Sequence, residues 1–359
     1  MAYELDELAQ IVGVKLKSIP NLGSLTEINT EIGALVRLNH LVNVATSPDY
    51  QHKKHVYTGS LSKDSRALPI IVIHYSGSVY GRDPEYFTRW YQDGKELFGG
   101  EVVVAKGSKL FPHLYSFDDE TTTLVVERAK SDLQELYLNP NSTPAEALDA
   151  ANKIVETFML GSKDGDRKEG FPRYIEAFLD PEYEYLRTSR FQDYYRDQDL
   201  IAYHNQTQEK LKAYTDELTK KSFTRGFGIP DCTPANLVED NKGNIMYIDI
   251  ERYAFTYHWL SLLGNVYQHA FDGNSQAEFT KALKAIALRS IAEYGDPELA
   301  TQLFVLGRLN SILIPATIRN IAFMAEIKQP IPEVVIRKTL DETNHLLQLD
   351  DDQLITGID

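Results

Sequence analysis

The sequence predicts an α+β fold with two lobes, a small mixed α/β lobe followed by a mainly helical one. Short segments rich in β-branched and aromatic residues gather in the first third of the chain, and helical apolar spacing dominates after Arg128. With 359 residues, 43% of them hydrophobic, the chain is long enough to form two cores. We place the N-terminal lobe at residues 1–128 and the C-terminal lobe at residues 129–359.

The first forty residues are expected to be mostly helical. Apolar residues recur there with helical spacing, at 5–16 and again at 25–41. Three strands should follow, at 40–46, 53–61 and 67–77, because β-branched and aromatic residues alternate between polar turns. This pattern predicts an antiparallel meander.

The rest of the small lobe is predicted as one helix and a hairpin. The helix should begin at Pro84, which the first helical turn tolerates, and should end at Gly99. Strands at 111–117 and 121–129 then form the hairpin across an acidic turn. The predicted element order of this lobe is therefore three strands, one helix and two strands.

The C-terminal lobe is expected to be helical at 131–137, 144–160 and 194–221. Strand character returns only briefly, in the short strand 237–239 and, after a polar turn, at 243–255. The chain beyond His258 again has helical spacing.

The charge restricts the partners of this protein. A formal net charge of −15 and a pI near 5.1 argue against a broad surface for nucleic acid or anionic membranes. Such surfaces need concentrated Lys and Arg. An acidic surface also repels nucleotides, so a phosphate site must be built locally from a metal ion, backbone amides or a few cations.

The single cysteine and the first residues predict a cytoplasmic protein. Cys232 alone cannot form an internal disulfide or a cysteine-based metal site. The start MAYELDELAQ carries acids where a secretory signal has a basic segment. No histidine near Cys232 in the sequence can activate it as a nucleophile, and the nine histidines lack zinc-site spacing.

The most informative segment runs from residue 228 to 252. Asp231 is followed five positions later by Asn236, then by a short strand, a turn at Lys242, and a second strand that ends in Asp249 and Glu251. This order resembles the catalytic and metal-binding loops of the kinase-like phosphotransferase superfamily. The Asp-x-Glu ending resembles its aminoglycoside phosphotransferase and choline kinase branch. The resemblance extends, more weakly, over about residues 41–270.

The resemblance implies a two-lobed protein-kinase-like fold and an ATP- and Mg²⁺-dependent phosphotransferase that acts on a hydroxyl of a small molecule. Asp231 would be the catalytic base, Asn236 and Asp249 would be metal ligands, and Glu251 would support the metal shell. The chemistry is consistent, because phosphoryl transfer needs an oriented nucleophile and neutralised phosphate oxygens. Hard cations such as Mg²⁺ favour amide and carboxylate oxygens.

The same resemblance assigns a nucleotide site to the small lobe. Backbone groups of Val126, Glu127 and Arg128 would lie beside the adenine. The strand at 67–77 has His74 where the superfamily places a phosphate-binding lysine, with Lys106 as the alternative counterpart. No glycine-rich phosphate loop is present.

The catalytic loop also departs from the family pattern. Ile229 and Pro230 stand where the family has His-Gly or His-Asn before the catalytic aspartate. Pro230 can stiffen the loop by fixing its own φ and holding Ile229 extended. This departure motivates an alternative function, a pseudokinase or nucleotide-binding interaction module with little or no transfer. Nucleotidyl transfer by the same fold is a third possibility.

A purely structural interpretation would make Asp231 and Asn236 turn residues, with Asp249 and Glu251 at a strand edge. Against it, Asp249 follows the apolar run Ile245–Ile248, which should be buried. A carboxylate at the end of a buried strand is costly without a partner such as a cation. The identity of the acceptor and the oligomeric state are not determined by the sequence.

Overall fold

The computed structural model describes residues 27–29, 35–40, 53–63, 66–76, 103–104, 108–110, 112, 114–118, 123–138, 142–163, 195–224, 226–229, 232–248, 254–326 and 332–348. The helices predicted at 5–16 and 84–99 lie outside these residues. So do Lys106, most of the predicted strand 40–46, and the predicted site residues Asp231, Asp249 and Glu251.

The chain divides into two compact units. The first comprises Met1–Lys130 together with Asp240–Glu251, and the second comprises Ser131–Glu239 together with Arg252–Asp359. The chain thus passes from the first unit to the second two residues after Arg128, and the short segment from Asp240 returns to the first unit.

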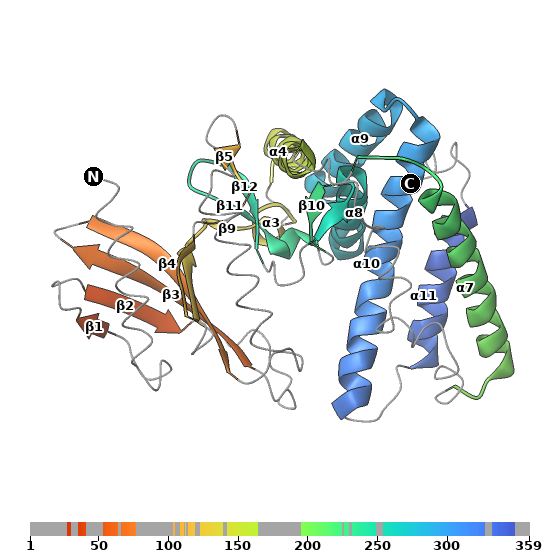
Figure 1. The fold of residues 1–359 in the computed structure, drawn as a ribbon, viewed down its shortest axis with the longest axis horizontal. Coiled ribbons are helices and arrows are strands. Elements are labelled where there is room, and N and C mark those ends of the chain that lie inside the picture. Colours follow the sequence, from red (N-terminus) through yellow and green to blue (C-terminus); the bar gives the residue numbers. More distant parts are fainter. Residues whose placement is uncertain are drawn as a thin grey trace. The chain divides into compact units, whose positions relative to one another are not determined.

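The first unit is built on a six-stranded antiparallel sheet in the order β1-β2-β3-β4-β8-β7 (Figure 1). Its strands are β1 Glu27–Asn29, β2 Leu35–His40, β3 Lys53–Lys63, β4 Arg66–Ser76, β7 Leu114–Asp118 and β8 Thr123–Glu127. A separate pair consists of β5 Val103–Val104 and β6 Ser108–Lys109. The strands predicted at 53–61, 67–77, 111–117 and 121–129 are confirmed.

The helix predicted across 25–41 is wrong where the structure describes it. Glu27–Asn29 and Leu35–His40 are strands, and β2 pairs with β3 along its whole length, from Leu35 opposite Ser62 to His40 opposite Tyr57. Apolar residues spaced three and four apart suggested a helix, but hydrogen bonding to the long strand β3 outweighs that local preference.

The second unit is mainly helical. Its helices are α3 Leu133–Tyr137, α4 Pro144–Lys163, α7 Gln198–Thr219, α8 Trp259–Asn274, α9 Glu278–Glu293, α10 Pro297–Glu326 and α11 Glu333–Gln348. The helices predicted at 131–137, 144–160, 194–221 and beyond His258 are confirmed. No helix within the described residues combines the length and apolar character needed to cross a membrane.

Side-chain caps determine where two of these helices begin. At α4 the Thr143 backbone N–H donates to the Glu146 carboxylate at 3.0 Å, and the Glu146 N–H donates to the Thr143 hydroxyl at 3.3 Å. This reciprocal pair is a capping box, and Pro144 occupies the first helical position. At α7 the Asp197 carboxylate accepts from the N–H groups of Asp199 and Leu200.

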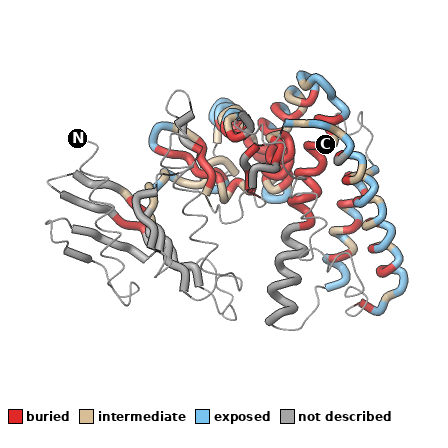
Figure 2. The backbone as a smooth tube through the Cα atoms, in the orientation of Figure 1, coloured by how far each residue is buried: buried red, intermediate tan, exposed pale blue. Residues whose placement is uncertain are grey.

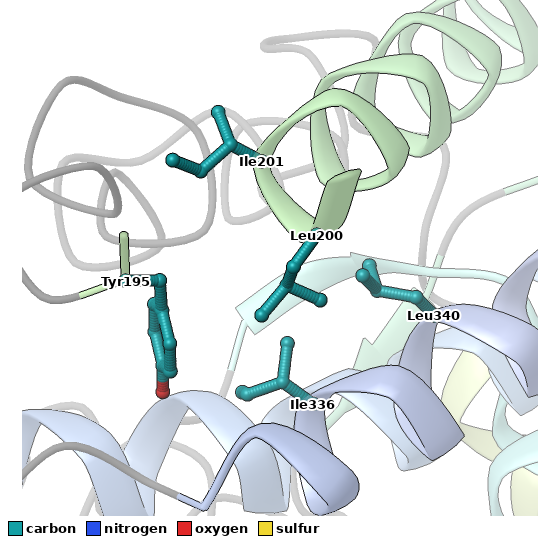
Figure 3. Close-up of a cluster of buried hydrophobic side chains, with 5 residues drawn as sticks. All are labelled: Tyr195, Leu200, Ile201, Ile336 and Leu340. Atoms are coloured by element: carbon teal, nitrogen blue, oxygen red, sulfur yellow. The ribbon is translucent and has the colours of Figure 1, made fainter. Parts of the chain in front are cut away.

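Buried residues of the second unit concentrate in α8, α9 and α10 (Figure 2). Leu263, Val266 and Phe304 are at most 1% exposed. A separate apolar cluster joins α7 to α11 (Figure 3) and consists of Tyr195, Leu200, Ile201, Ile336 and Leu340. Figure 1 shows α10 between α8 and the α7–α11 pair.

The helices α8 and α10 cross each other at close range. A Cβ atom built on Gly264 would overlap the backbone carbonyl oxygen of Phe304, and one built on Gly307 would overlap that of Ser261. Glycine at both positions therefore allows the two helix backbones to approach more closely than any side chain would permit.

A buried polar network lies beside the crossing. Arg308 on α10 is 9% exposed, and its Nε donates to Oε1 of Gln268 at 2.8 Å. Gln268 in turn donates from Nε2 to the Asp272 carboxylate at 2.9 Å. The Arg308 guanidinium carbon lies 5.3 Å from the centre of the Tyr267 ring, which is within cation–π range.

We expect Gly264→Ala and Gly307→Ala each to lower the free energy of unfolding by about 1–3 kcal/mol, because the added methyl group forces α8 and α10 apart. Urea denaturation measures this loss. Gly295→Ala is the matched control, since a Cβ there has no heavy atom within 4 Å. Equal stability of the Gly264→Ala and Gly295→Ala proteins would show that the crossing tolerates expansion.

Candidate functional site

The predicted adenine-binding segment lies at the end of β8. Val126 pairs with Ile71 of β4 and with Leu114 of β7, and Glu127 pairs with Ile70. The Arg128 N–H then donates to the Pro69 carbonyl at 3.2 Å. The β7 register ends at Val126, so within the described strands Glu127 pairs only with β4.

His74 lies on β4, the neighbour of β8 in the sheet. Its backbone is opposite Thr123 of β8 and His55 of β3. The structure therefore brings the predicted phosphate-binding position and the predicted adenine-binding segment onto adjacent strands of the same sheet.

The segment around Asp231 is anchored on both sides by buried residues. β10 Gly226–Gly228 leads into Ile229, which is 1% exposed, and Cys232 is completely buried. A 3₁₀ helix, η4 Pro234–Asn236, follows at once, with Pro234 buried at its start and the Asn236 N–H donating to the Thr233 carbonyl at 3.0 Å. Asn236 is half-buried at the end of this helix.

Two strand pairs hold this segment within the second unit. After η4, β11 Leu237–Glu239 pairs with β9 Ser131–Asp132. Before it, β10 pairs with β13 Ala254–Tyr257, with Gly228 opposite Ala254. The sequence on either side of Asp231 is thus tied to strands that lie far away along the chain.

A buried carboxylate fixes β11 to α3. Glu239 is 7% exposed and accepts a hydrogen bond of 2.6 Å from the hydroxyl of Tyr137. The Tyr137 ring stacks on Phe279 of α9, with centroids 5.5 Å apart. Burial, and then the bond to Glu239, raise the pKa of Tyr137 far above its ordinary value, so its hydroxyl stays a neutral donor.

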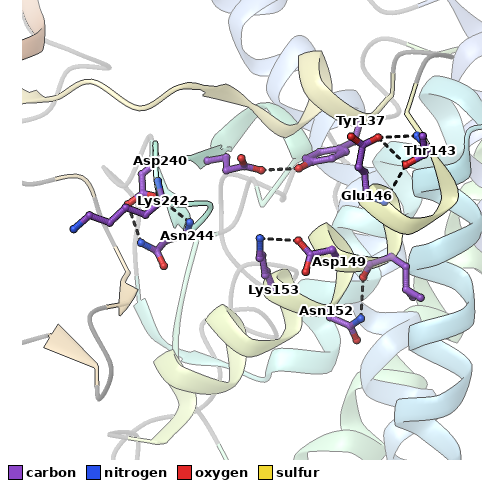
Figure 4. A network of polar contacts seen from close by, with 11 residues as sticks. Tyr137, Thr143, Glu146, Asp149, Asn152, Lys153, Asp240, Lys242 and Asn244 are labelled. Carbon is purple, nitrogen blue, oxygen red and sulfur yellow. Dashed lines mark hydrogen bonds and ion pairs between the residues drawn. The ribbon is translucent and has the colours of Figure 1, made fainter.

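The next residue, Asp240, closes the turn that leads to β12 Ile245–Tyr247 (Figure 4). All residues of β12 are at most 2% exposed, and the Tyr247 N–H donates to the Leu110 carbonyl at 2.9 Å. The sequence predicted that Asp249 follows a buried strand, and the burial of β12 confirms this.

A buried histidine begins α8, directly after β13. His258 is 2% exposed, and its Nδ1 accepts from the Leu260 N–H at 3.2 Å, so the ring proton must lie on Nε2. Nε2 lies 3.3 Å from the hydroxyl of Tyr294, to which it donates. Burial lowers the pKa of His258 to about 3, which keeps the imidazole neutral and able to cap the helix.

A shallow cavity of about 340 Å³ lies between α7 and α11. Its lining is polar, and the lining residues bond to one another: the Tyr203 hydroxyl donates to Asp341 at 2.7 Å, and the Lys210 ammonium donates to Asn344 at 3.1 Å. These internal bonds identify a structural joint between the two helices.

The described residues contain no group of three His, Cys, Asp or Glu side chains placed to hold a metal ion. Of the predicted metal ligands, Asn236 is described, whereas Asp249 and Glu251 belong to the undescribed segment 249–253. The metal site therefore stays a prediction.

Sequence analysis missed Tyr137, Glu239, Asp240 and His258 as parts of this region. Asp240 begins the turn signal Asp-Asn-Lys-Gly-Asn, so local sequence could have identified it. Tyr137 and Glu239 are separated by 102 positions, and no local pattern connects them.

Comparison with known proteins identifies the fold. No protein-family model and no curated protein sequence match the chain. Among solved structures, a choline/ethanolamine kinase family protein from Mesorhizobium loti matches with a TM-score of 0.55 and 13% identity, over 96% of this chain and 97% of that one. Aminoglycoside phosphotransferase APH(4)-Ia matches with a TM-score of 0.55 and 15% identity, over 94% of this chain and 98% of that one.

Choline kinase LicA from Streptococcus pneumoniae matches with a TM-score of 0.53 and 14% identity, over 93% of this chain and 98% of that one. LicA has also been solved in complex with AMP. At such low identity the likeness concerns the fold alone. The chain has the protein-kinase-like α+β fold of these phosphotransferase structures, and the fold class predicted from the sequence is confirmed.

The neutral state of His258 predicts acid sensitivity. Below about pH 6.5 the unfolded chain takes up a proton at His258 that the folded protein does not, so the free energy of unfolding falls as the pH decreases towards 3. We expect His258→Asn, which keeps a helix-capping oxygen, to reduce this slope by up to about 1.4 kcal/mol per pH unit. Urea denaturation between about pH 6 and pH 4 measures the slope.

His345→Asn provides the matched control, because His345 is an exposed histidine on α11. If His258→Asn leaves the pH slope of the wild-type protein unchanged, His258 is protonated in the folded state and does not cap α8 through Nδ1.

Proposed function

We propose that this protein transfers the terminal phosphoryl group of ATP to a hydroxyl group of a small molecule, with Mg²⁺ as the metal ion. The fold supports this proposal, because the structures with the same fold are named choline, ethanolamine and aminoglycoside phosphotransferases. The AMP complex of LicA supports a nucleotide as the donor.

The observation that carries the proposal is that buried, described residues border the predicted loops in the sequence. Asp231 falls between the buried residues Ile229 and Cys232, Asn236 ends η4, and Asp249 follows the buried strand β12 by two residues. Functional groups on short loops between anchored elements are held more precisely than groups on long loops.

The donor chemistry fits Mg²⁺. The amide oxygen of Asn236 and the carboxylates of Asp249 and Glu251 are hard oxygen donors, which this ion prefers over nitrogen or sulfur. When bound, the ion would neutralise charge on the phosphate oxygens. Asn236 and Asp249 would hold it, and Glu251 would support its shell.

Asp231 would act on the acceptor. Its carboxylate would accept the proton of the attacking hydroxyl as the oxygen forms a bond to the terminal phosphorus and the bond to ADP breaks. The acceptor would lie between the loop that carries Asp231 and the C-terminal helices.

The first unit would bind the nucleotide. Backbone groups of Val126, Glu127 and Arg128 would face the adenine, and His74 on the neighbouring strand would stand in the position of the phosphate-binding lysine. Neutral imidazole is a weaker phosphate partner than an ammonium group, so backbone amides and the metal ion would carry more of the phosphate charge.

One observation favours the alternative, a pseudokinase or nucleotide-binding module. Ile229 occupies the place of the family's loop histidine and is 1% exposed, so apolar packing replaces a polar contact there. Transfer of a nucleotidyl group is a third outcome, and ATP labelled at the α- or the γ-phosphate distinguishes it from phosphorylation.

We expect ATP with Mg²⁺ to raise the melting temperature of the wild-type protein, and Asp249→Ala to abolish most of the metal-dependent part. A ligand that binds only the native state stabilises it by about 2.7 kcal/mol at a hundredfold excess over its Kd. Glu293→Ala is the control, because Glu293 is an exposed acid on α9 whose removal changes the net charge equally. A full shift in Asp249→Ala would remove Asp249 from the metal site.

We expect Asp231→Ala to bind ATP with nearly wild-type affinity while its turnover falls by about 10²–10⁴, since a general base acts in the transition state. Phosphoryl transfer to an acceptor is the preferred assay, and slow ATP hydrolysis can serve in its place. Unchanged kcat in Asp231→Ala contradicts the assigned role. Nucleotide binding in the wild-type protein without phosphoryl consumption on any acceptor supports the pseudokinase.

A further inference from the structure

Arg308 on α10 is a buried cation without an ion pair. Its side chain is 9% exposed, and its Nε donates to Oε1 of Gln268 at 2.8 Å. Within the described residues no carboxylate forms an ion pair with the guanidinium. Arginine is almost never buried to this degree unless it is paired, because removing its charge from water is costly. The unpaired charge therefore needs an explanation.

Two residues of α8 fix the orientation of the guanidinium. Gln268 accepts from Nε, and the Gln268 amide is fixed in turn, because its Nε2 donates to the Asp272 carboxylate at 2.9 Å. The guanidinium carbon lies 5.3 Å from the centre of the Tyr267 ring. Because Gln268 occupies Nε, the two Nη groups form the free edge of the guanidinium and present four N–H donors.

The Tyr267 hydroxyl is a second available donor. Tyr267 is 1% exposed, and its hydroxyl has no hydrogen-bond partner in the described part of the chain. Burial raises the pKa of Tyr267, and the nearby Arg308 charge partly opposes this. The hydroxyl is therefore protonated at neutral pH and lies close enough to the guanidinium to be affected by its charge.

These donors favour a carboxylate as the ligand. Two free Nη groups match the two oxygens of a carboxylate in a bidentate arrangement. A doubly charged phosphate fits less well, because the Asp272 carboxylate interacts electrostatically with Arg308 and repels a second negative charge there. The small exposure of Arg308 admits only a small head group.

We infer that Arg308 and Tyr267 form a binding site for the carboxylate group of a small molecule. The site lies at the contact of α8 with α10, wholly within the second unit. The Nη groups bind the two carboxylate oxygens, and the Tyr267 hydroxyl donates to one of them. The bound group neutralises the Arg308 charge. This inference is independent of the proposed phosphotransferase function, because the site contains none of the residues assigned to catalysis, metal or nucleotide.

The test uses sodium acetate as the probe and measures the melting temperature of the full chain without nucleotide. Sodium chloride at the same ionic strength gives the baseline. We expect acetate to raise the melting temperature, and the concentration dependence of this rise gives the Kd of acetate. Arg308→Met removes the charge, keeps an unbranched side chain and should abolish the acetate-dependent rise.

Two further variants and a second anion sharpen the experiment. Arg289→Met is the matched control, because Arg289 is an exposed arginine on α9, and this variant should keep the wild-type rise. Tyr267→Phe keeps the ring but removes the hydroxyl. We expect it to raise the Kd of acetate about tenfold, the effect of losing one hydrogen bond to a charged group. Inorganic phosphate at the same ionic strength should raise the melting temperature less than acetate does.

Each of the contrary outcomes overturns the inference. An equal acetate-dependent rise in Arg308→Met and in the wild-type protein would be a general salt effect. Equal melting temperatures of the wild-type protein in acetate and in chloride would show that Asp272, acting through Gln268, compensates the Arg308 charge by itself. A larger rise with phosphate, lost in Arg308→Met, would contradict the carboxylate assignment. If Arg308→Met does not fold, an unchanged Kd of acetate in Tyr267→Phe decides against the site.

Discussion

The helical unit depends on the close approach of α8 and α10 at Gly264 and Gly307. Because the two backbones are in contact there, α8 can shift little relative to α10. His258 caps the start of α8 and is continuous with β13, and β13 pairs with β10. β10 in turn leads into the loop that carries Asp231. The α8–α10 crossing is thus connected, through α8, β13 and β10, to the described residues that precede Asp231.

Buried polar side chains of the helical unit have hydrogen-bond or cation–π partners that fix their orientation. Arg308 is held by Gln268 and the Tyr267 ring, His258 by Leu260 and Tyr294, and Glu239 by Tyr137. A hydrogen bond in a poorly solvated site is costly to break, so each of these groups resists rotation. The same property lets Glu239 fix β11 to α3 and lets Asp240 fix the turn before β12.

The departures from the family pattern concern contacts more than architecture. Ile229 is buried where the family has a histidine, so apolar packing can support the loop in place of a polar contact. His74 lies on β4, beside the strand that carries Val126, so the positions predicted to bind the nucleotide share one sheet. The protein-kinase-like fold is therefore retained where these residues differ from the family pattern.

The fold class and most of the element order could be predicted from the amino-acid sequence, because strand alternation, helical spacing and turn residues are local signals. The sequence also identified the segment of Asn236 and the buried strand before Asp249, whereas the roles of Asp231, Asn236, Asp249 and Glu251 stay predictions. That 27–29 and 35–40 are strands could not be predicted, since β2 pairs with β3 and β1 with β2, and this pairing outweighs a helical pattern. The Tyr137–Glu239 bond and the α8–α10 crossing likewise join residues that are distant in the chain, and such contacts leave no local periodicity to read.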